Sequence, residues 1–385
     1  MKEGWTYKKL KDIGVVITGN TPSTKDKENY SSDDYCFVKP SDIAKDGVSI
    51  IKDSESYISE KGYNSSRKLP KGSVLTTCIG IIGKVGILEI DATCNQQINA
   101  IIPFRTILPK YLALAILSVK SQLEAMANAP VVPIINKGDF SNVEIPVPSF
   151  EEQERIVAEL DLLTGIIDKQ KQQLKELDTL AQSIFYDMFG NPQTDERGWN
   201  MEKLSSICVS ISDGSHNPPK GGKKSDYLML SSKNIKDGVL SLEEPRYLSK
   251  DEFSLENKRT NVKKGDILLT IVGTIGRCCL FDSSKNIVFQ RSVAILKPND
   301  TTNNLFLMYQ MIMLRMVFEN EAKGVAQKGI YLKQLGNIMV IVPPKGLQDS
   351  FAQKIQAIES QKESINRSLA EIQKLFDYTM DNYFG

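Results

Sequence analysis

The sequence is poor in histidine and contains no paired cysteine motif. His216 is the only histidine, which excludes a catalytic pair of histidines and a metal site built from several of them. None of the six cysteines lies in a Cys-x-x-Cys pair, and most fall in apolar runs, where a reduced thiol packs as a small hydrophobic side chain. We therefore expect no metal site among Cys36, Cys78, Cys94, Cys208, Cys278 and Cys279.

Long hydrophobic runs are also missing. The longest nearly apolar stretch, residues 111–119, is shorter than the roughly 20 residues that span a bilayer. The first ten residues lack the apolar segment of a signal peptide. We therefore expect a cytoplasmic protein without a membrane partner.

A large excess of one charge is missing from the whole chain, although not from its parts. The 385 residues have a net charge of +1, but residues 151–187 contain nine acidic and four basic side chains, so the rest of the chain is positive. We expect this positive charge on a surface that binds DNA. The length exceeds that of one ordinary core, and 41% hydrophobic with 25% charged residues is typical of folded domains. At least two domains are therefore expected.

The chain contains an internal repeat. Residues 4–10 (Gly-Trp-Thr-Tyr-Lys-Lys-Leu) return as residues 198–204 (Gly-Trp-Asn-Met-Glu-Lys-Leu), so the only two tryptophans occupy one repeated position. Two glycine-bounded turns, at residues 80–84 and 273–277, each follow a short apolar run and end in a cation. These matches predict two tandem copies of one module.

Each copy is predicted to contain a strand-rich domain followed by one long helix. Short β-branched runs separated by Gly, Pro, Asn and Ser are typical of a twisted, mostly antiparallel sheet. A helix is also expected inside each domain, over residues 109 to about 127 and 303 to about 323. The strand runs of the first copy are residues 15–18, 74–79, 86–90 and 98–103. The expected fold is α+β, with strand-rich domains at 1–148 and 191–344 and long helices at 149–190 and 345–385.

Both long helices carry a heptad pattern. Ser149 and Glu152 have the spacing of a helix N-cap and its capping-box partner, and apolar residues then recur every three or four positions up to Met188. Matched seams predict that the two helices pair. If the two domains lie at opposite ends of the pair, it is an antiparallel coiled coil with polar Gln170 and Lys362 near its middle. Alternatively, each helix covers only its own sheet. The expected seam consists of Ile156, Leu160, Leu163, Ile167, Leu174, Leu177, Phe351, Ile355, Ile358, Ile365, Leu369 and Ile372.

These features resemble the specificity subunit of type I restriction-modification enzymes over essentially the whole chain. The matching motifs are Gly-Asn-Thr-Pro-Ser at 19–23, Asp-Gly-Ser-His at 213–216 and Ser-Lys-Asn-Ile at 232–235, together with the glycine-bounded turns. Ile-Pro-Val-Pro at 145–148 leads into Glu-Glu-Gln, whereas the second copy keeps only the glutamine, Gln348. The order and the duplication of the motifs make the resemblance specific.

The resemblance implies a non-catalytic subunit with two target-recognition domains, each of which reads one half of a bipartite DNA sequence. The long helices would space the domains and dock two methyltransferase subunits, and restriction and translocation subunits would complete the complex. Adenine methylation with S-adenosylmethionine, and cleavage with ATP and magnesium, would belong to these partners, so no cofactor is expected in this chain. A helix roughly 50 Å long would hold the readers about one turn of DNA apart, leaving an unread gap of about six base pairs.

Three kinds of side chain are candidates for DNA contacts. Loop 213–236 has five lysines against two aspartates, whereas the lysines of loop 21–30 are offset by acidic neighbours. Cations end the two glycine turns, where backbone amides suit a phosphate oxygen, and amide or guanidinium forks can read adenine and guanine edges. A solvated loop, a plain hairpin turn or backbone satisfaction would explain the same patterns. The candidates are Thr21, Ser23, Lys25, Lys27, Lys39, Ser41, Lys84, Gln96, Gln97, Asn136, Lys137, Ser215, His216, Lys220, Lys223, Lys224, Ser232, Lys233, Asn234, Arg277, Gln290, Arg291, Lys328 and Tyr331.

Catalysis by this chain is not expected. Asn-Pro-Pro at 217–219 resembles a motif of DNA amino-methyltransferases, but Lys220 stands where an aromatic residue would stack on the flipped base, and no glycine-rich cofactor loop is present. The main alternative function is a tandem-repeat adaptor that joins proteins. We expect the acidic residues Glu151, Glu152 and Glu159 to contribute to partner docking.

Overall fold

The computed structural model describes residues 4–127, 132–322 and 329–385. The chain forms two compact units: Met1–Lys171 with Arg367–Gly385, and Gln172–Asn366. We refer to these as unit 1 and unit 2 and describe each by itself. Within the described residues, no helix combines the length and the apolar character needed to cross a membrane.

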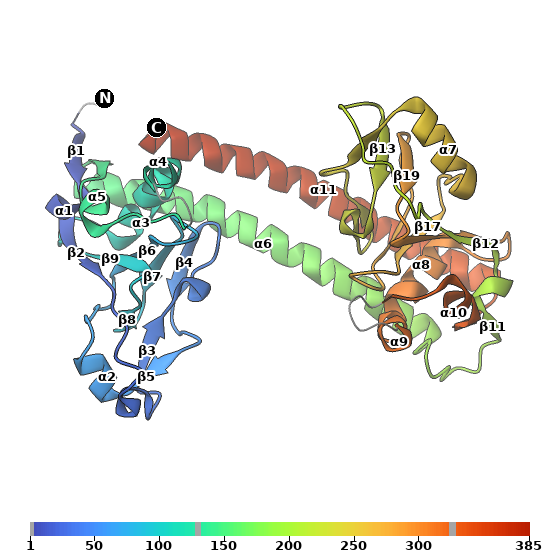
Figure 1. Ribbon diagram of the computed structural model, residues 1–385, viewed down its shortest axis with the longest axis horizontal. Coiled ribbons are helices and arrows are strands. Elements are labelled where there is room, and N and C mark those ends of the chain that lie inside the picture. Colours follow the sequence, from blue (N-terminus) through green and yellow to red (C-terminus); the bar gives the residue numbers. More distant parts are fainter. Residues whose placement is uncertain (1–3, 128–131, 323–328) are drawn as a thin grey trace. The chain divides into compact units, whose positions relative to one another are not determined.

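Unit 1 is built on a five-stranded sheet with the order β2-β9-β6-β7-β4 (Figure 1). Neighbouring strands are antiparallel except for the parallel pair β4 and β7. A smaller sheet has the order β5-β3-β8, and β1 pairs with β10. The strands are β1 (Thr6–Lys9), β2 (Gly14–Thr18), β3 (Tyr35–Val38), β4 (Val48–Ile51), β5 (Tyr57–Ile58), β6 (Val74–Thr77), β7 (Val85–Leu88), β8 (Thr93–Cys94), β9 (Ile98–Pro103) and β10 (Glu144–Val147).

The four strand runs expected in the first copy are confirmed as β2, β6, β7 and β9. Every residue of β6 and of β7 is buried, because side chains pack on both faces of these central strands. Unit 1 also contains the helices α1 (Leu10–Ile13), α2 (Glu60–Asn64), α3 (Pro109–Ser118), α4 (Lys120–Met126) and α5 (Lys137–Ser141).

Unit 2 repeats this plan. Its larger sheet has the order β12-β20-β17-β18, a smaller sheet has the order β16-β13-β19, and β14 pairs with β15 and β11 with β21. The strands are β11 (Met201–Lys203), β12 (Cys208–Asp213), β13 (Tyr227–Leu230), β14 (Ile235–Lys236), β15 (Val239–Leu240), β16 (Arg246–Leu248), β17 (Ile267–Thr270), β18 (Cys278–Leu280), β19 (Asn286–Phe289), β20 (Val293–Pro298) and β21 (Met339–Ile341). The helices are α7 (Lys250–Thr260), α8 (Asn304–Met313), α9 (Arg315–Glu321) and α10 (Leu332–Asn337).

The single helix expected inside each domain is wrong: each is two helices. The first breaks at Val119, between α3 and α4, and the second at Leu314, between α8 and α9. After each break a long cation packs over a turn glycine: a Cβ on Gly83 would lie 2.8 Å from Lys120 Cγ, and one on Gly276 would lie 2.9 Å from Arg315 Cγ. This contact joins residues that are distant in sequence, so helical periodicity cannot report it.

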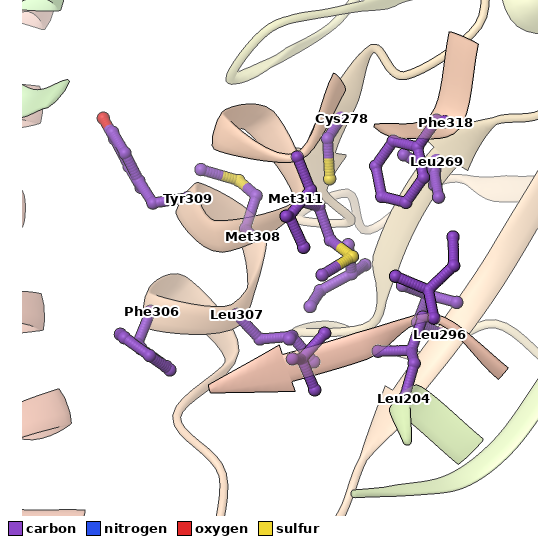
Figure 2. Close-up of a cluster of buried hydrophobic side chains, with 14 of the residues drawn as sticks. Leu204, Leu269, Cys278, Leu296, Phe306, Leu307, Met308, Tyr309, Met311 and Phe318 are labelled. Carbon is purple, nitrogen blue, oxygen red and sulfur yellow. The ribbon is translucent and has the colours of Figure 1, made fainter. Parts of the chain in front are cut away.

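The core of unit 2 lies between α8 and the larger sheet. Figure 2 shows Leu307 and Met311 of α8 on the side of the helix that faces Leu296 of β20, while Tyr309 projects on another side. Phe306 is 1% exposed and packs against aromatic rings of both long helices. The α8 helix is therefore covered on more than one face, which explains why nearly all of its residues are apolar.

The two long helices are α6 (Phe150–Phe189) and α11 (Lys345–Phe384), with 40 residues each (Figure 1). Ser149 Oγ accepts a 3.3 Å hydrogen bond from the amide of Glu152, as expected for the N-cap. In unit 1, Gln170 Nε2 donates to Ser368 Oγ at 2.7 Å, and Tyr383 Oη donates to Glu159 Oε2 at 2.6 Å. Since residue numbers rise along one helix as they fall along the other, the helices are antiparallel there.

The helices are also paired in unit 2. Lys362 Nζ lies 2.8 Å from Asp178 Oδ1, and Phe185 packs edge-on against Phe351 at 5.5 Å between ring centroids. Falling numbers on α11 again match rising numbers on α6, so the pairing is antiparallel. Each helix contributes to the cores of both units, and the alternative that each covers only its own sheet is wrong.

The seam residues face the interior of the helix pairs. Seven of them are less than 10% exposed: Ile156, Leu160, Leu163, Ile167, Phe351, Ile355 and Ile358. The other five are half-buried: Leu174, Leu177, Ile365, Leu369 and Ile372.

Near its end, α6 departs from the heptad count. Phe185 and Phe189 are fully buried, whereas Ile184 and Met188, the positions the count selects, are only partly buried. A helix has 3.6 residues per turn, so a stripe counted at 3.5 drifts to a neighbouring position over several turns. The end of α6 therefore enters the unit 2 core with its aromatic face.

A repeated glutamine ties each long helix to its domain. Gln153 and Gln348 are both 1% exposed. Gln153 Oε1 accepts a 3.0 Å hydrogen bond from the amide of Leu108, directly before α3. Gln348 Oε1 accepts a 2.8 Å bond from the amide of Asn303, directly before α8. This glutamine, shared by the two copies, fixes the start of the long helix to the preceding helix.

Candidate DNA interface

A glycine fixes the loop that follows β2 in unit 1 and the loop that follows β12 in unit 2. A Cβ on Gly19 would lie 2.1 Å from Asn95 O, and one on Gly214 would lie 2.1 Å from Phe289 O, so a side chain fits at neither position. The Gly19 amide donates to Ile98 O at 2.9 Å, and the Gly214 amide donates to Val293 O at 3.2 Å. Each loop therefore packs closely against the turn that precedes β9 in unit 1 or β20 in unit 2.

Three loops meet at this edge of each unit. In unit 2, the amide of Arg291 donates to Ser215 O at 2.9 Å, and the amide of Ile330 donates to Ile271 O at 2.9 Å. In unit 1, the amide of Ile135 bonds to Cys78 O at 2.9 Å in the same way. We call this arrangement the three-loop edge; it comprises residues 19–23, 95–97 and 134–137 in unit 1 and residues 214–216, 290–292 and 329–332 in unit 2.

The three-loop edge brings together several predicted contact residues. In unit 1, Thr21 Oγ1 donates to Gln96 Oε1 at 2.6 Å, and Asn95 Nδ2 donates to Gln97 Oε1 at 2.8 Å. Thr21, Gln96 and Lys137 are exposed there. In unit 2 the edge holds Ser215, His216, Gln290, Arg291 and Tyr331.

A pocket opens at the edge of unit 2. Its volume is about 410 Å³, and charged or aromatic side chains share its wall with apolar ones. Asp213, His216, Arg259, Arg291 and Tyr331 line it together with Ile271, Val272, Gly329, Ile330 and Leu332. Tyr331 is 72% exposed, so its ring is free to meet a ligand. A mixture of cations, an imidazole and an exposed ring suits a nucleic acid better than an apolar molecule.

A buried carboxylate organises one wall of the pocket. Asp213 is 7% exposed; its Oδ1 accepts a 2.6 Å hydrogen bond from Arg259 Nη2, and its Oδ2 lies 2.7 Å from His216 Nε2. Arg259 Nε also donates to Asp213 O at 3.1 Å. The two partners are half-exposed and are held at the pocket by one aspartate.

A further segment adjoins the edge in each unit. The amide of Asn95 bonds to Val38 O at 3.1 Å, next to predicted Lys39 and Ser41; Lys39 Nζ lies 5.7 Å from the centre of the Phe37 ring. In unit 2 the amide of Ser232 donates to Ser292 Oγ at 3.1 Å. Lys233 is exposed beside it and lines a second pocket, of about 820 Å³.

Other predicted cations lie on exposed loops. Lys220, Lys223 and Lys224 are exposed between β12 and β13, and Lys25 and Lys27 are exposed between β2 and β3. Ser23 is exposed beside them, and its carbonyl accepts a 3.0 Å bond from Asn29 Nδ2. Lys328 lies outside the described residues.

Three predicted contacts already have structural partners within the chain. Lys84 Nζ donates to Pro40 O and Ile43 O, both at 2.8 Å, so the first glycine turn uses its cation to hold a neighbouring loop. Asn136 caps α5 by accepting from the amide of Asp139 at 2.9 Å. Asn234 is 6% exposed and donates to Glu243 O at 2.8 Å. Arg277, the counterpart of Lys84, is half-buried.

Two arginines outside the predicted set of contacts occupy equivalent places in the two units. Arg67 Nη1 donates to the carbonyl oxygen of Thr18, the last residue of β2, at 2.5 Å. Arg259 Nε donates to the carbonyl oxygen of Asp213, the last residue of β12, at 3.1 Å. An arginine kept at nearly the same offset as the other repeated motifs was the available signal.

The acidic start of α6 is partly neutralised within the chain. Arg155 donates to both oxygens of Glu152, at 2.7 and 2.8 Å, and its guanidinium lies 3.7 Å from Glu159 Oε2. The hydrogen bond from Arg155 to Glu152 holds the pKa of the Arg155 guanidinium above its usual range. Glu151 is exposed.

Comparison with known proteins identifies the family to which this chain belongs. A family model described as the type I restriction modification DNA specificity domain matches twice, over residues 2–179 and 196–374. The chain therefore belongs to this family.

Individual relatives agree with this assignment. The MjaIX specificity subunit of Methanocaldococcus jannaschii is 32% identical over 235 residues, which are 56% of this chain and 54% of that protein. The chain thus spans about half the length of this relative.

Two solved structures share the fold. A type I restriction-modification S subunit from M. genitalium has a TM-score of 0.56 and 14% identity, with 99% of this chain and 96% of that one covered. A chain from a structure described as concerning complex assembly and conformational transition of the type I R-M system has a TM-score of 0.59 and 19% identity, with 100% and 98% covered.

Proposed function

We propose that this chain is the DNA-reading, non-catalytic specificity subunit of a type I restriction-modification complex. Each unit binds one half of a bipartite duplex target through its three-loop edge. The observation that carries the proposal is that one backbone arrangement, held by a glycine without room for a Cβ, occurs twice and presents different side chains. A shared scaffold with different contact residues is what recognition of two different half-sites requires.

The chemistry of the edges supports base reading beside phosphate contacts. Gln96 in unit 1, and Gln290 with Arg291 in unit 2, have amide or guanidinium forks that match adenine and guanine in the major groove. Exposed lysines on the flanking loops, Lys25 and Lys27 in one unit and Lys220, Lys223 and Lys224 in the other, suit phosphate oxygens. Because the two sets differ, the target is asymmetric.

Partner subunits supply the chemistry in this proposal. Two methyltransferase subunits dock on the long helices, and restriction and translocation subunits join them in the cytoplasm. S-adenosylmethionine, ATP and magnesium are bound by those partners. Glu151 is exposed for docking, whereas Glu152 and Glu159 already bond to Arg155 and Tyr383. A test of docking through Glu152 or Glu159 therefore has to include the stability of the helix pair.

The decisive experiment maps the methylation that the chain directs. The chain is co-expressed with a methyltransferase subunit of the same system, and modified adenines are located on a plasmid by single-molecule sequencing. The expected result is a split, asymmetric motif with an unread gap of about six base pairs. Random or absent methylation by a folded complex would overturn the proposal.

The rival function, a tandem-repeat protein adaptor, predicts a different response to salt. Phosphate contacts release counterions, so DNA affinity should fall steeply as the salt concentration rises. An adaptor with solvated lysine loops should show no DNA affinity that falls steeply with salt concentration.

A further inference from the structure

The Asp213 carboxylate is buried in the wall of the unit 2 pocket, and the arrangement around it points to a role in sequence preference. Its side chain is 9% exposed, and each oxygen has one partner, Arg259 at 2.6 Å and His216 at 2.7 Å. Both oxygens of this carboxylate are therefore occupied by partners within the chain. The side chains it holds are about half exposed, at 49% for Arg259 and 50% for His216.

We infer that Asp213 is a positioning residue that orients His216 and Arg259 as base contacts, and thereby sets the base preference of one half-site. This inference rests on the proposed function and deepens it. It adds Arg259 to the contact residues and assigns the pocket lined by these three side chains to a base edge of the duplex.

The hydrogen bonds define which atoms face the ligand. Because His216 Nε2 points at a carboxylate oxygen, that nitrogen carries the proton, and Nδ1 is the ring atom left for DNA. Arg259 gives Nε and Nη2 to Asp213 and keeps its Nη1 group for a ligand. The carboxylate thus turns two flexible side chains into a fixed pair, which reduces the conformational entropy lost on binding.

Other lining residues of the pocket supply groups of matching chemistry. Arg291, held at the end of β19 by its backbone bond to Ser215, and the exposed ring of Tyr331 face the same space. Two guanidinium groups near one carboxylate leave the pocket with excess positive charge. An electron-rich base edge next to a phosphate backbone fits this charge.

Unit 1 lacks the carboxylate. Thr18 stands where unit 2 has Asp213, and its Oγ1 donates to Asn99 Oδ1 at 2.6 Å; the Arg67 guanidinium donates to the Thr18 carbonyl instead of a carboxylate. The Asp213 arrangement is therefore a feature of unit 2 added to a scaffold common to both units. Its loss should affect one half-site and spare the other.

The test compares D213N and H216A in the full chain co-expressed with its methyltransferase subunit. Methylation is measured on a plasmid library that contains every single-base variant of both half-sites. D213N should change base preference at the same positions as H216A, lowering methylation of the preferred base there by roughly tenfold. The other half-site should keep its profile. Adding D213N to a variant that already carries H216A and R259Q should cause no further change, because both side chains that Asp213 orients are then gone.

Control variants separate positioning from folding. D300N changes an exposed aspartate of the same unit, outside loop 213–236, and should leave both profiles unchanged. If D213N also lowers the melting temperature of the chain, H216A and R259Q, which replace half-exposed side chains, provide the test. These two variants still have to change base preference at the positions that D213N affects.

Two results would overturn the inference alone. One is that D213N and H216A affect different positions or none, while the wild type reads a split target. The other is an equal loss at both half-sites. A wild-type chain that directs no split motif would overturn the proposed function, and the inference with it.

Discussion

Tyr383 of α11 donates a 2.6 Å hydrogen bond to Glu159 of α6, although 224 residues separate them. The bond lies in unit 1, where the last 19 residues of the chain complete a domain that the N-terminal part begins. Phe384 follows directly and packs against Tyr111, with ring centroids 5.5 Å apart. The end of the chain is therefore part of the unit 1 core.

Replacement of Tyr383 by phenylalanine should lower the free energy of unfolding by about 1 kcal/mol, since a hydrogen bond to a carboxylate is lost at a partly solvated site. Urea denaturation monitored by circular dichroism measures this. Y378F is the matched control, because Tyr378 is 69% exposed on the same helix and should change stability little. Equal stability of Y383F and Y378F would contradict the assigned role.

Phe185 should matter far more than the neighbouring apolar residues of α6. It is fully buried against Phe189, Phe306 and Phe351, so F185A should cost about 3–5 kcal/mol. L180A is the control, since Leu180 is 47% exposed and should cost less than about 0.5 kcal/mol. If both variants unfold at the wild-type denaturant concentration, the aromatic face of α6 is not part of the core.

Gly214 should not tolerate alanine. The added methyl group would lie 2.1 Å from Phe289 O, so the loop has to move away from β19. We expect G214A to lose about 1–3 kcal/mol of stability and to lose binding at one half-site. G222A is the control in the same loop, because a Cβ there meets no atom within 4 Å. Thermal unfolding together with DNA binding distinguishes the two variants; wild-type behaviour of G214A would refute the requirement for glycine.

Lys220 should act through phosphate charge. K220Q should weaken DNA binding similarly for every sequence and reduce the slope of log affinity against log salt by about one unit. Fluorescence anisotropy between low and moderate salt measures this slope. K374Q removes an exposed lysine of α11, away from the recognition loops in sequence, and should leave the slope unchanged. A change in base preference without a change in slope would mean that Lys220 reads bases instead.

Lys362 should contribute stability that depends on pH. Burial lowers the pKa of its ammonium, but the hydrogen bonds to Asp178 and Glu359 outweigh burial and the pKa is raised. A lysine whose folded pKa is raised stabilises the folded state below its unfolded pKa and loses this contribution as the pH rises through the folded pKa.

The K362M variant should therefore be less stable than wild type at neutral pH, by about 1–2 kcal/mol because Asp178 remains half-exposed. The difference should shrink above about pH 10.4. K354M, at an exposed position of the same helix, serves as the control. A stability difference that stays constant through this range would show that packing, not charge, accounts for the effect.

Local patterns in the amino-acid sequence were enough to predict the repeat, the central strands and the start of α6. The repeated tryptophan segment and glycine turns specified two copies of one domain, because residues that maintain the same core recur at the same offset. The central strands β2, β6, β7 and β9 followed from β-branched runs between turn residues, and the start of α6 followed from the Ser149 cap. The heptad seam predicted that the two long helices pair, since apolar spacing depends only on helix geometry, and the hydrogen bonds between them show that the pair is antiparallel.

Which polar side chains already have partners within the chain could be seen only once the packing of the segments was known. Lys84, Asn136 and Asn234 carry the right chemistry for DNA, but contacts with residues distant or near in sequence occupy their side chains. Asp213, Arg259 and His216 meet because β12, the following loop and α7 pack together, which no spacing rule reports. The phase of α6 at Phe185 was likewise set by the unit 2 core: a straight helix drifts from a seven-residue count, and burial of the largest side chains fixes the face that turns inward.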